Sequence, residues 1–256
     1  MPDVHPAAAA GFAKSAAIYV KGRPDYPPEV EDWLRGDLAL KKGKTVLDLG
    51  AGTGKFIPNL RATGATIIAV EPVAAMLAQL IELNPGITAT QGSAEHIPLT
   101  DASVDAVVCA QSFHWFARRE ALAEIHRVLK PGGVLGLIWN VRDESVPWVA
   151  ALSEIMRPYE GDTPRHHRQE WRALFPAEGF GPLRERRFPH GHTGSPEQVI
   201  VDRVLSVSFI AALSPEEQAC VASQIRELVE KTPELADKSD VTFPYETAAF
   251  SCVKMD

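Results

Sequence analysis

One stretch of this sequence reads Leu47-Asp48-Leu49-Gly50-Ala51-Gly52-Thr53-Gly54, an apolar segment that ends in closely spaced glycines. The apolar run 45–49 predicts a short strand, and the segment 55–63 predicts a helix. The glycines between them allow a tight turn and let backbone N–H groups approach a ligand closely. A helix that begins behind such a turn also favours negative charge at its N-terminus. The stretch therefore predicts a strand, a ligand-binding turn and a helix.

The alternation of apolar strands and helices continues to about residue 140. Further strands are predicted at 66–70, 87–91, 104–110 and 134–139, and further helices at 73–83 and 118–130. The run Pro131-Gly132-Gly133 is the expected end of the last of these helices. Strands that alternate with helices pair in parallel through right-handed crossovers, and apolar strands of this kind are covered on both faces. We therefore expect an α/β fold around a mostly parallel sheet.

The alternation loosens beyond residue 140. Strands are predicted at 183–188 and 242–253, and helices at 145–159, 164–175, 196–212 and 215–231. The last helix has a clear start, because Ser214 can cap it and Pro215 suits its first position. A short helix is also expected from residue 28 or 29 to 34. With no repeat and no linker, we expect a single domain, 1–256, with an N-terminal lid segment (1–36), a cofactor-binding core (37–140), a helical insertion (141–180) and a C-terminal part (181–256).

The composition limits the classes of function. The 256 residues are 45% hydrophobic and 23% charged, as is ordinary for a globular protein, and the net charge of −7 argues against a nucleic-acid surface. The three cysteines have no metal-ligand spacing, and no apolar run approaches the roughly 20 residues of a membrane span. The N-terminus also lacks the basic segment of a secretion signal. We expect a cytoplasmic protein that binds no membrane, no nucleic acid and no metal.

Glu71 ends the second predicted strand. Its distance along the chain from Gly50 suits a carboxylate that accepts hydrogen bonds from ribose hydroxyls, so a nucleoside-containing ligand should lie across the carboxyl ends of the strands. The dinucleotide fingerprint is G-x-G-x-x-G, whereas this loop has G-x-G-x-G. That spacing argues against a nicotinamide-dependent, NAD(P)-using oxidoreductase, which is the first alternative.

Asp48 adds an acid two residues before Gly50. The resulting pattern, acid-x-G-x-G-x-G, resembles motif I of the class I S-adenosylmethionine-dependent methyltransferases. The resemblance covers about the first 140 residues and continues through four further segments in the expected order, namely Glu71-Pro72, Gly92 to Leu99, Asp101 to Asp105, and Leu129 to Gly133. It implies a Rossmann-like, seven-stranded, mostly parallel sheet with an antiparallel last strand, an N-terminal lid and a helical insertion.

The same resemblance implies roles toward S-adenosyl-L-methionine and its product S-adenosyl-L-homocysteine. The turn would approach the methionine portion through Gly50, Ala51, Gly52 and Gly54, with Asp48 supporting the loop and the ammonium group. Glu71 would hold the ribose and Gln111 would lie beside the methionine portion. The adenine would meet Pro72, Ser93, Ala94 and Glu95.

The segment 19–27 resembles a Y-x-x-x-R-P-x-Y-P segment of the small-molecule branch called methyltransferase type 11 or trans-aconitate-methyltransferase-like. There it forms part of a lid over the cofactor. Arg23 or Tyr19 would then meet the methionine carboxylate, and Tyr19 would also border the acceptor. The alternative is a proline-rich strap in which Arg23 is solvated.

The hexapeptide Gln111-Ser112-Phe113-His114-Trp115-Phe116 follows the fourth predicted strand. His114-Trp115 matches a His-Trp pair that lies beside the transferred methyl group in this branch. His114 has a suitable ordinary pKa for a general base, or it shapes the wall of the substrate site; the alternative is a cap for the next helix. Trp115 would pack the acceptor or support the loop, and Phe116 is expected to pack in the core.

We therefore expect a monomer or homodimer that transfers a methyl group to an oxygen, nitrogen or carboxylate of a small molecule. A non-catalytic protein that binds the cofactor is the second alternative. Two features of the expected insertion remain to be placed. His166-His167 is expected to be exposed, and Trp148, Met156 and Tyr159 would either line a pocket or pack between helices.

Overall fold

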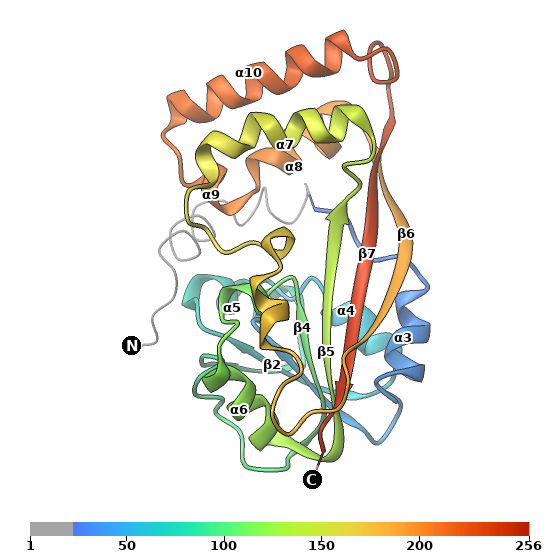
Figure 1. Cartoon of the computed structure of the whole chain (residues 1–256), viewed down its shortest axis with the longest axis vertical. Coiled ribbons are helices and arrows are strands. Elements are labelled where there is room, and N and C mark those ends of the chain that lie inside the picture. Colours follow the sequence, from blue (N-terminus) through green and yellow to red (C-terminus); the bar gives the residue numbers. More distant parts are fainter. Residues whose placement is uncertain (1–22, 256) are drawn as a thin grey trace.

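The computed structural model describes residues 23–255, so that Tyr19 and the rest of segment 1–22 lie outside the described residues (Figure 1). One seven-stranded sheet has the order β3-β2-β1-β4-β5-β7-β6. Its strands are β1 Thr45–Leu49, β2 Thr66–Glu71, β3 Thr88–Gln91, β4 Val104–Ala110, β5 Leu129–Arg142, β6 Arg184–Gly194 and β7 Val241–Val253. Strands β1 to β5 pair in parallel, while β7 is antiparallel to both β5 and β6. The expected Rossmann-like sheet with an antiparallel last strand is confirmed.

Helices cover both faces of this sheet because alternate residues of the central strands point to opposite sides. Leu47 and Leu49 pack on the face covered by α6 (Arg119–Val128), whereas Val46 packs on the face covered by α3 (Val30–Gly36) and α4 (Ile57–Ala62). Helix α5 (Ala74–Leu83) joins the second of these clusters through Leu80. Both clusters include residues of β1 and β4, and both strands have the bounds predicted from the sequence.

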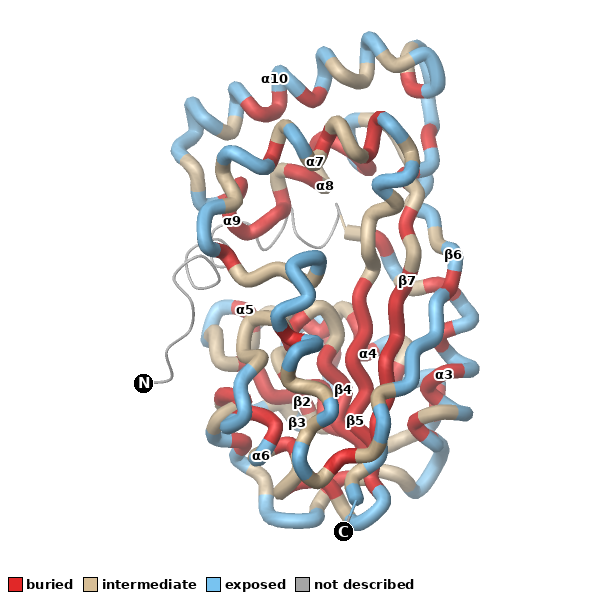
Figure 2. The backbone as a smooth tube through the Cα atoms, viewed as in Figure 1, coloured by how far each residue is buried: buried red, intermediate tan, exposed pale blue. Residues whose placement is uncertain are grey.

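A helical cap lies beyond the carboxyl ends of β4 and β5 (Figure 1). It consists of α7 (Pro147–Glu160), the π-helix η4 (Glu197–Asp202), α8 (Arg203–Leu205), α9 (Ser208–Ala211) and α10 (Pro215–Lys231). Figure 2 shows buried residues on the inner faces of these helices. They form a separate apolar cluster that includes Trp148, Met156 and Ile225 and reaches Phe243 on β7. The cap therefore combines chain from before and after β6.

Helix α10 has the predicted bounds, and the hydroxyl of Ser214 accepts a hydrogen bond from the backbone of Glu217 in a complete capping box. The helix predicted at 196–212 is instead broken into η4, α8 and α9. Its interruption lies at Ser206, whose hydroxyl bonds to the carbonyl of Arg203, and at Val207, which has an extended backbone. None of the helices within residues 23–255 is long and apolar enough to cross a membrane.

The region predicted as a helix at 164–175 forms two short 3₁₀ helices, η2 (His166–Arg168) and η3 (Glu170–Leu174). Gln169 between them has a left-handed backbone with φ of 57°, which ends the first turn. The third short 3₁₀ helix, η1 (Phe113–Trp115), follows β4 directly. These turns place aromatic and histidine side chains between the sheet and the cap.

Candidate functional site

The glycine turn lies at the carboxyl end of β1 and is tied to β2. The N–H groups of Gly50 and Ala51 both point to the carbonyl of Val70, at 2.8 and 3.2 Å. Gly50 has a φ of +69°, and a Cβ built on it would lie 2.8 Å from the Cβ of Ser112. Both the backbone conformation and the close approach therefore require glycine at this position.

Glu71 holds the other side of this turn. One carboxylate oxygen accepts a hydrogen bond from the N–H of Gly52 at 2.8 Å, and the other accepts from the N–H of Val73 at 2.9 Å. The residue is only 4% exposed. Burial raises the pKa of the Glu71 carboxyl, although the bonds from Val73 and Gly52 oppose that rise. The carboxylate is thus fixed in one orientation at the wall of a cavity.

Asp48 lies behind the turn and not at the cavity wall. It is fully buried, and within residues 23–255 neither of its carboxylate oxygens has a hydrogen-bond partner. Burial, together with the nearby charge of Glu71, raises the pKa of Asp48 to about 7. The structure therefore places Asp48 beneath the loop and not among the residues that line the cavity.

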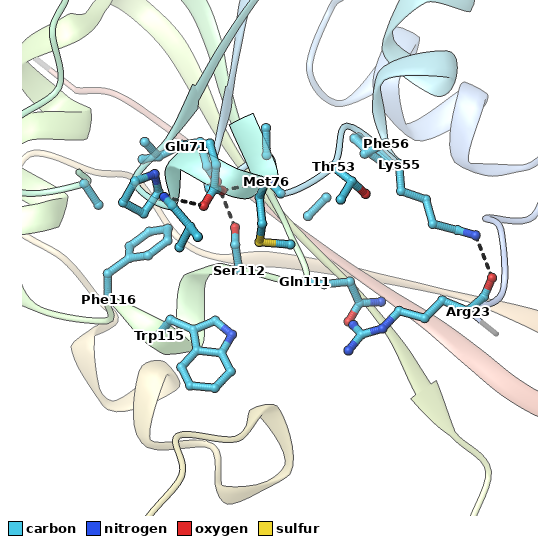
Figure 3. A pocket seen from close by; sticks show the side chains of 18 of the residues that line it. Arg23, Thr53, Lys55, Phe56, Glu71, Met76, Gln111, Ser112, Trp115 and Phe116 are labelled. Carbon is cyan, nitrogen blue, oxygen red and sulfur yellow. Dashed lines mark hydrogen bonds between the residues drawn. The ribbon is translucent and has the colours of Figure 1, made fainter. Parts of the chain in front are cut away.

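A first cavity extends along the carboxyl ends of β1, β2 and β4. Figure 3 shows Phe116 and Trp115 along one side and Arg23 with Lys55 along the opposite side. Most of the residues expected to hold the cofactor line this cavity, namely Arg23, Gly50, Ala51, Gly52, Glu71, Pro72, Ser93, Ala94, Glu95 and Gln111. Gly54 does not; a Cβ there would lie 2.5 Å from Asn84, so this glycine permits close packing of the loop. Phe116, expected in the core, contacts Phe113 edge-on but also lines the cavity.

The segment Arg23–Tyr26 crosses one end of the cavity and is held by the core and the cap together. Lys55 donates a hydrogen bond to the carbonyl of Arg23 at 2.6 Å, and Asn140 donates to the carbonyl of Asp25 at 2.9 Å. Arg23 itself donates to the carbonyl of Ser206 in the cap at 3.2 Å. These contacts favour the lid interpretation of this segment over that of a solvated strap.

Gln111 occupies the turn between β4 and η1. Its backbone has a φ of 59°, and its N–H donates to the carbonyl of Ile138 at 2.8 Å. A left-handed backbone is uncommon for a residue other than glycine and is often found at functional sites. The conformation allows η1 to leave the sheet at once, so that His114 and Trp115 face the cap.

A second cavity of about 340 Å³ lies between this turn and the cap. Its volume is within the range of small-molecule sites, which runs from about 300 to 1,000 Å³. The two cavities adjoin, because both are lined by Arg23, Gln111, Trp115, Asn140 and Arg203. His114 and Met156 line only the second cavity, while Trp148 and Tyr159 pack inside the cap.

His114 is held by a tryptophan at the end of the sheet. The indole N–H of Trp139 donates to Nδ1 of His114 at 3.1 Å. Burial and then the nearby charge of Arg165 lower the pKa of His114 well below its ordinary value. His114 is therefore a neutral imidazole at neutral pH, and Nδ1 is already used as an acceptor.

His166 lies elsewhere than the sequence predicted. It was expected to be exposed, but its ring stacks on Trp171 at 5.7 Å and lies 4.6 Å from the ring of Trp139 at the wall of the second cavity. Burial lowers its pKa to about 4. His167 is exposed, as expected. The sequence carries no periodic signal for His166, because its position depends on the packing of the cap against the sheet.

Comparison with known proteins indicates the family to which the chain belongs. Residues 47–137 match a family model described as a methyltransferase domain. The chain is 41% identical to an uncharacterized methyltransferase-like protein of Schizosaccharomyces pombe, over 95% of each chain.

Solved structures share the fold at low sequence identity. A putative methyltransferase from an antibiotic biosynthesis pathway of Anabaena variabilis superposes with a TM-score of 0.63 at 18% identity, covering 90% of this chain and 98% of that one. An N-methyltransferase of Haemonchus contortus, in complex with phosphomonomethylethanolamine and S-adenosylhomocysteine, gives a TM-score of 0.56 at 17% identity, covering 96% and 57%.

Proposed function

Because the chain belongs to the S-adenosylmethionine-dependent methyltransferases, we propose that it methylates an oxygen, nitrogen or carboxylate of a small molecule bound in the second cavity. The observation that supports this proposal is that the two cavities adjoin. Methyl transfer from a sulfonium is an in-line displacement that needs two aligned reactants and little water. Walls shared at Gln111, Trp115 and Asn140 would let the two reactants meet without leaving the protein.

The residues of the first cavity fit S-adenosylmethionine. Each oxygen of Glu71 accepts one backbone hydrogen bond and keeps a further lone pair for a ribose hydroxyl. The glycine turn brings backbone close to the ligand, and Met76, Ala94 and Phe116 offer apolar contact to an adenine ring. Bound there, the cofactor supplies an electrophilic methyl group on sulfur. Arg23 lines the same cavity and suits the methionine carboxylate.

His114 would act by donating a hydrogen bond. A neutral imidazole has one N–H and one lone pair, and the lone pair on Nδ1 already accepts from Trp139. The remaining Nε2–H can orient an acceptor but cannot take its proton. This arrangement supports His114 as a substrate-orienting residue in place of the general base considered from the sequence.

Because the lone pair of His114 is occupied, His114 cannot take a proton from the acceptor, and this bears on which atom accepts the methyl group. A carboxylate oxygen and a neutral amine need no base before they attack, whereas an alcohol does. We infer that His114 suits an acceptor atom that needs no base, namely a carboxylate oxygen or a neutral amine nitrogen; an alcohol would need another group of the cavity wall, such as Glu144 or Glu160, as its base. Trp115, which lines both cavities, would pack against the acceptor next to the methyl group. We further propose that the protein acts alone or as a homodimer.

Calorimetric titration combined with label transfer tests the proposal. We expect S-adenosylmethionine and S-adenosylhomocysteine to bind, and NADH not to bind. The protein should also transfer a labelled methyl group from S-adenosylmethionine to a compound in a protein-free and nucleic-acid-free metabolite extract. Binding of the cofactor without any labelled small molecule would favour the non-catalytic alternative. In a parallel incubation with whole-cell extract, label found only on macromolecules would contradict a small-molecule acceptor.

A further inference from the structure

Three arginines from separate elements line the second cavity. Arg142 ends β5, Arg165 lies in the segment after α7, and Arg203 begins α8. Arg142 and Arg165 line only this cavity, whereas Arg203 also lines the first. The packing of the cap on the sheet thus brings together three side chains that are up to 61 positions apart in the sequence.

These three arginines form no ion pair within the part of the chain that the structure describes. Among residues 23–255, none of the three has a carboxylate within 4.0 Å, the limit for an ion pair. Within residues 23–255, the guanidinium of Arg142 makes only two hydrogen bonds, both long at 3.5 Å, to the hydroxyl of Ser153 and to the sulfur of Met156. Arg203 has two buried guanidinium nitrogens, Nε and Nη1, that find no hydrogen-bond partner among the described residues. The head of Arg165 lies over the ring of Phe209 at 5.1 Å.

The two acidic residues on the same wall are bonded to other groups. Glu160 pairs with Arg168 at 3.0 Å, and Glu144 accepts a hydrogen bond from Ser153 at 2.5 Å. Arg157, which also lines the cavity, pairs with Glu154 on the surface. The wall therefore carries ion-paired charges at Glu160 and Arg157, whereas Arg142, Arg165 and Arg203 have no ion-pair partner in the described part of the chain.

Besides burial, the positive charges of neighbouring arginines lower the pKa of Arg142 and Arg165, because each charge disfavours the charged form of the others. Burial and then the charges of Arg203 and Arg165 lower the pKa of Arg142 to about 9. Burial lowers the pKa of Arg165 to about 10, although Glu160 opposes this. Guanidinium groups held together without a counter-ion cost stability, and an arrangement of this kind is retained at sites where a ligand supplies the opposite charge.

We propose that Arg142, Arg165 and Arg203 form an anion-binding subsite of the acceptor cavity, which takes a carboxylate or phosphate group of the acceptor. The inference rests on the proposed function in assigning the second cavity to the acceptor. Guanidinium groups bind both anions through paired N–H donors. Because Arg142 and Arg165 line only the second cavity and Arg203 lines both, the bound anion lies in the second cavity and reaches the shared wall only at Arg203. The acceptor is then an acidic small molecule whose reacting atom lies near His114 and Trp115.

Thermal unfolding in simple anions tests the subsite without any need for turnover. The probes are succinate and inorganic phosphate, each compared with chloride at matched ionic strength. We expect the melting temperature of the native chain to rise in succinate, in phosphate or in both. A rise in succinate alone identifies a carboxylate subsite, and a rise in phosphate alone identifies a phosphate subsite. No rise over chloride in either would overturn the proposal.

Two variants and one control locate the effect. Arg142→Met removes one unbalanced charge while keeping an aliphatic side chain, and Arg203→Gln provides a second variant should the first fail to fold. Each should weaken anion binding about tenfold or more, because a charge-assisted hydrogen bond is lost. Arg142→Met should also melt at an equal or higher temperature without the anion, an effect that a merely structural arginine would not give. Arg226→Gln, which removes a surface arginine of the cap paired with Glu197, should respond like the native chain.

The inference and the proposed function can fail separately. Equal anion responses in the native chain, Arg142→Met and Arg203→Gln would overturn the subsite. Calorimetry with S-adenosylhomocysteine would then show whether cofactor binding remains. Conversely, an anion response that is lost in Arg142→Met would support the subsite even if no methyl group reached a small molecule.

Discussion

The indole N–H of Trp139 donates a hydrogen bond to Nδ1 of His114 over 3.1 Å. An indole nitrogen can only donate, so the lone pair of the neutral imidazole lies on Nδ1 and its proton on Nε2. The ring of Trp139 itself packs against His166 at 4.6 Å and against Trp171 at 4.7 Å. A rigid partner of this kind fixes both the orientation and the tautomer of His114.

His114→Ala should lower turnover about ten- to a hundredfold, because one hydrogen bond to the acceptor is lost. His114→Gln should retain more activity, since an amide can still donate. Steady-state rates measure the loss, and calorimetry should find nearly unchanged affinity for S-adenosylhomocysteine in both variants. Equal loss of cofactor affinity and turnover would mean that His114 supports the fold and not the acceptor.

The buried pair of Trp139 and His114 also predicts how turnover depends on pH. Burial and neighbouring cations keep the pKa of His114 well below its ordinary value, so its protonation should not change between about pH 6 and 8. Turnover of the native chain should therefore show no histidine ionisation in this range. A rise in turnover with an apparent pKa near 6.5 that is lost in His114→Gln would instead establish His114 as a general base.

Glu71→Ala should weaken binding of S-adenosylhomocysteine by about tenfold to a few hundredfold. The change removes an acceptor for ribose hydroxyls and leaves the N–H groups of Gly52 and Val73 without their partner. Isothermal calorimetry measures the change, and Glu82→Ala on the exposed side of α5 provides the control. Affinity that is the same in both variants would contradict a ribose-binding role.

The central part of the fold could be predicted because its signals are local. Apolar runs identified β1 and β4, and the capping residue Ser214 identified the start of α10. The carboxyl ends of neighbouring parallel strands meet at one edge, so Gly50, Glu71 and Gln111 could be expected together. All three line the same cavity.

The acceptor side could not be predicted because it depends on tertiary packing. Arg142, Arg165 and Arg203 share no sequence pattern, and only the seating of the cap on the sheet brings them to one wall. The single helix expected at 196–212 also fails to predict the break at Ser206 and Val207, which separates α8 from α9. In the same way, no local feature of His114 indicates that Trp139 will occupy its lone pair.

Gly50→Ala should destabilise the chain by about 3 kcal/mol or more and abolish cofactor binding, because strain and overpacking act together. Gly43→Ala is the matched control: its φ is +88°, but a Cβ there has nothing within 4 Å. The control should show only the left-handed strain of about 1–2 kcal/mol. Urea unfolding gives both values, and equal destabilisation would mean that the contact with Ser112 relaxes freely.

Asp48 should make the chain less stable as the pH rises. An acid whose pKa is 3.8 when unfolded and about 7 when folded releases its proton first from the unfolded state, so stability falls between these two values and is constant above them. The difference corresponds to about 4 kcal/mol. Asp48→Asn cannot ionise, so its stability relative to the native chain should increase between pH 5 and pH 8 in urea unfolding, mostly below about pH 7. A constant difference between the two proteins across this range would show that Asp48 is already ionised in the fold, which would require a buried partner for its carboxylate.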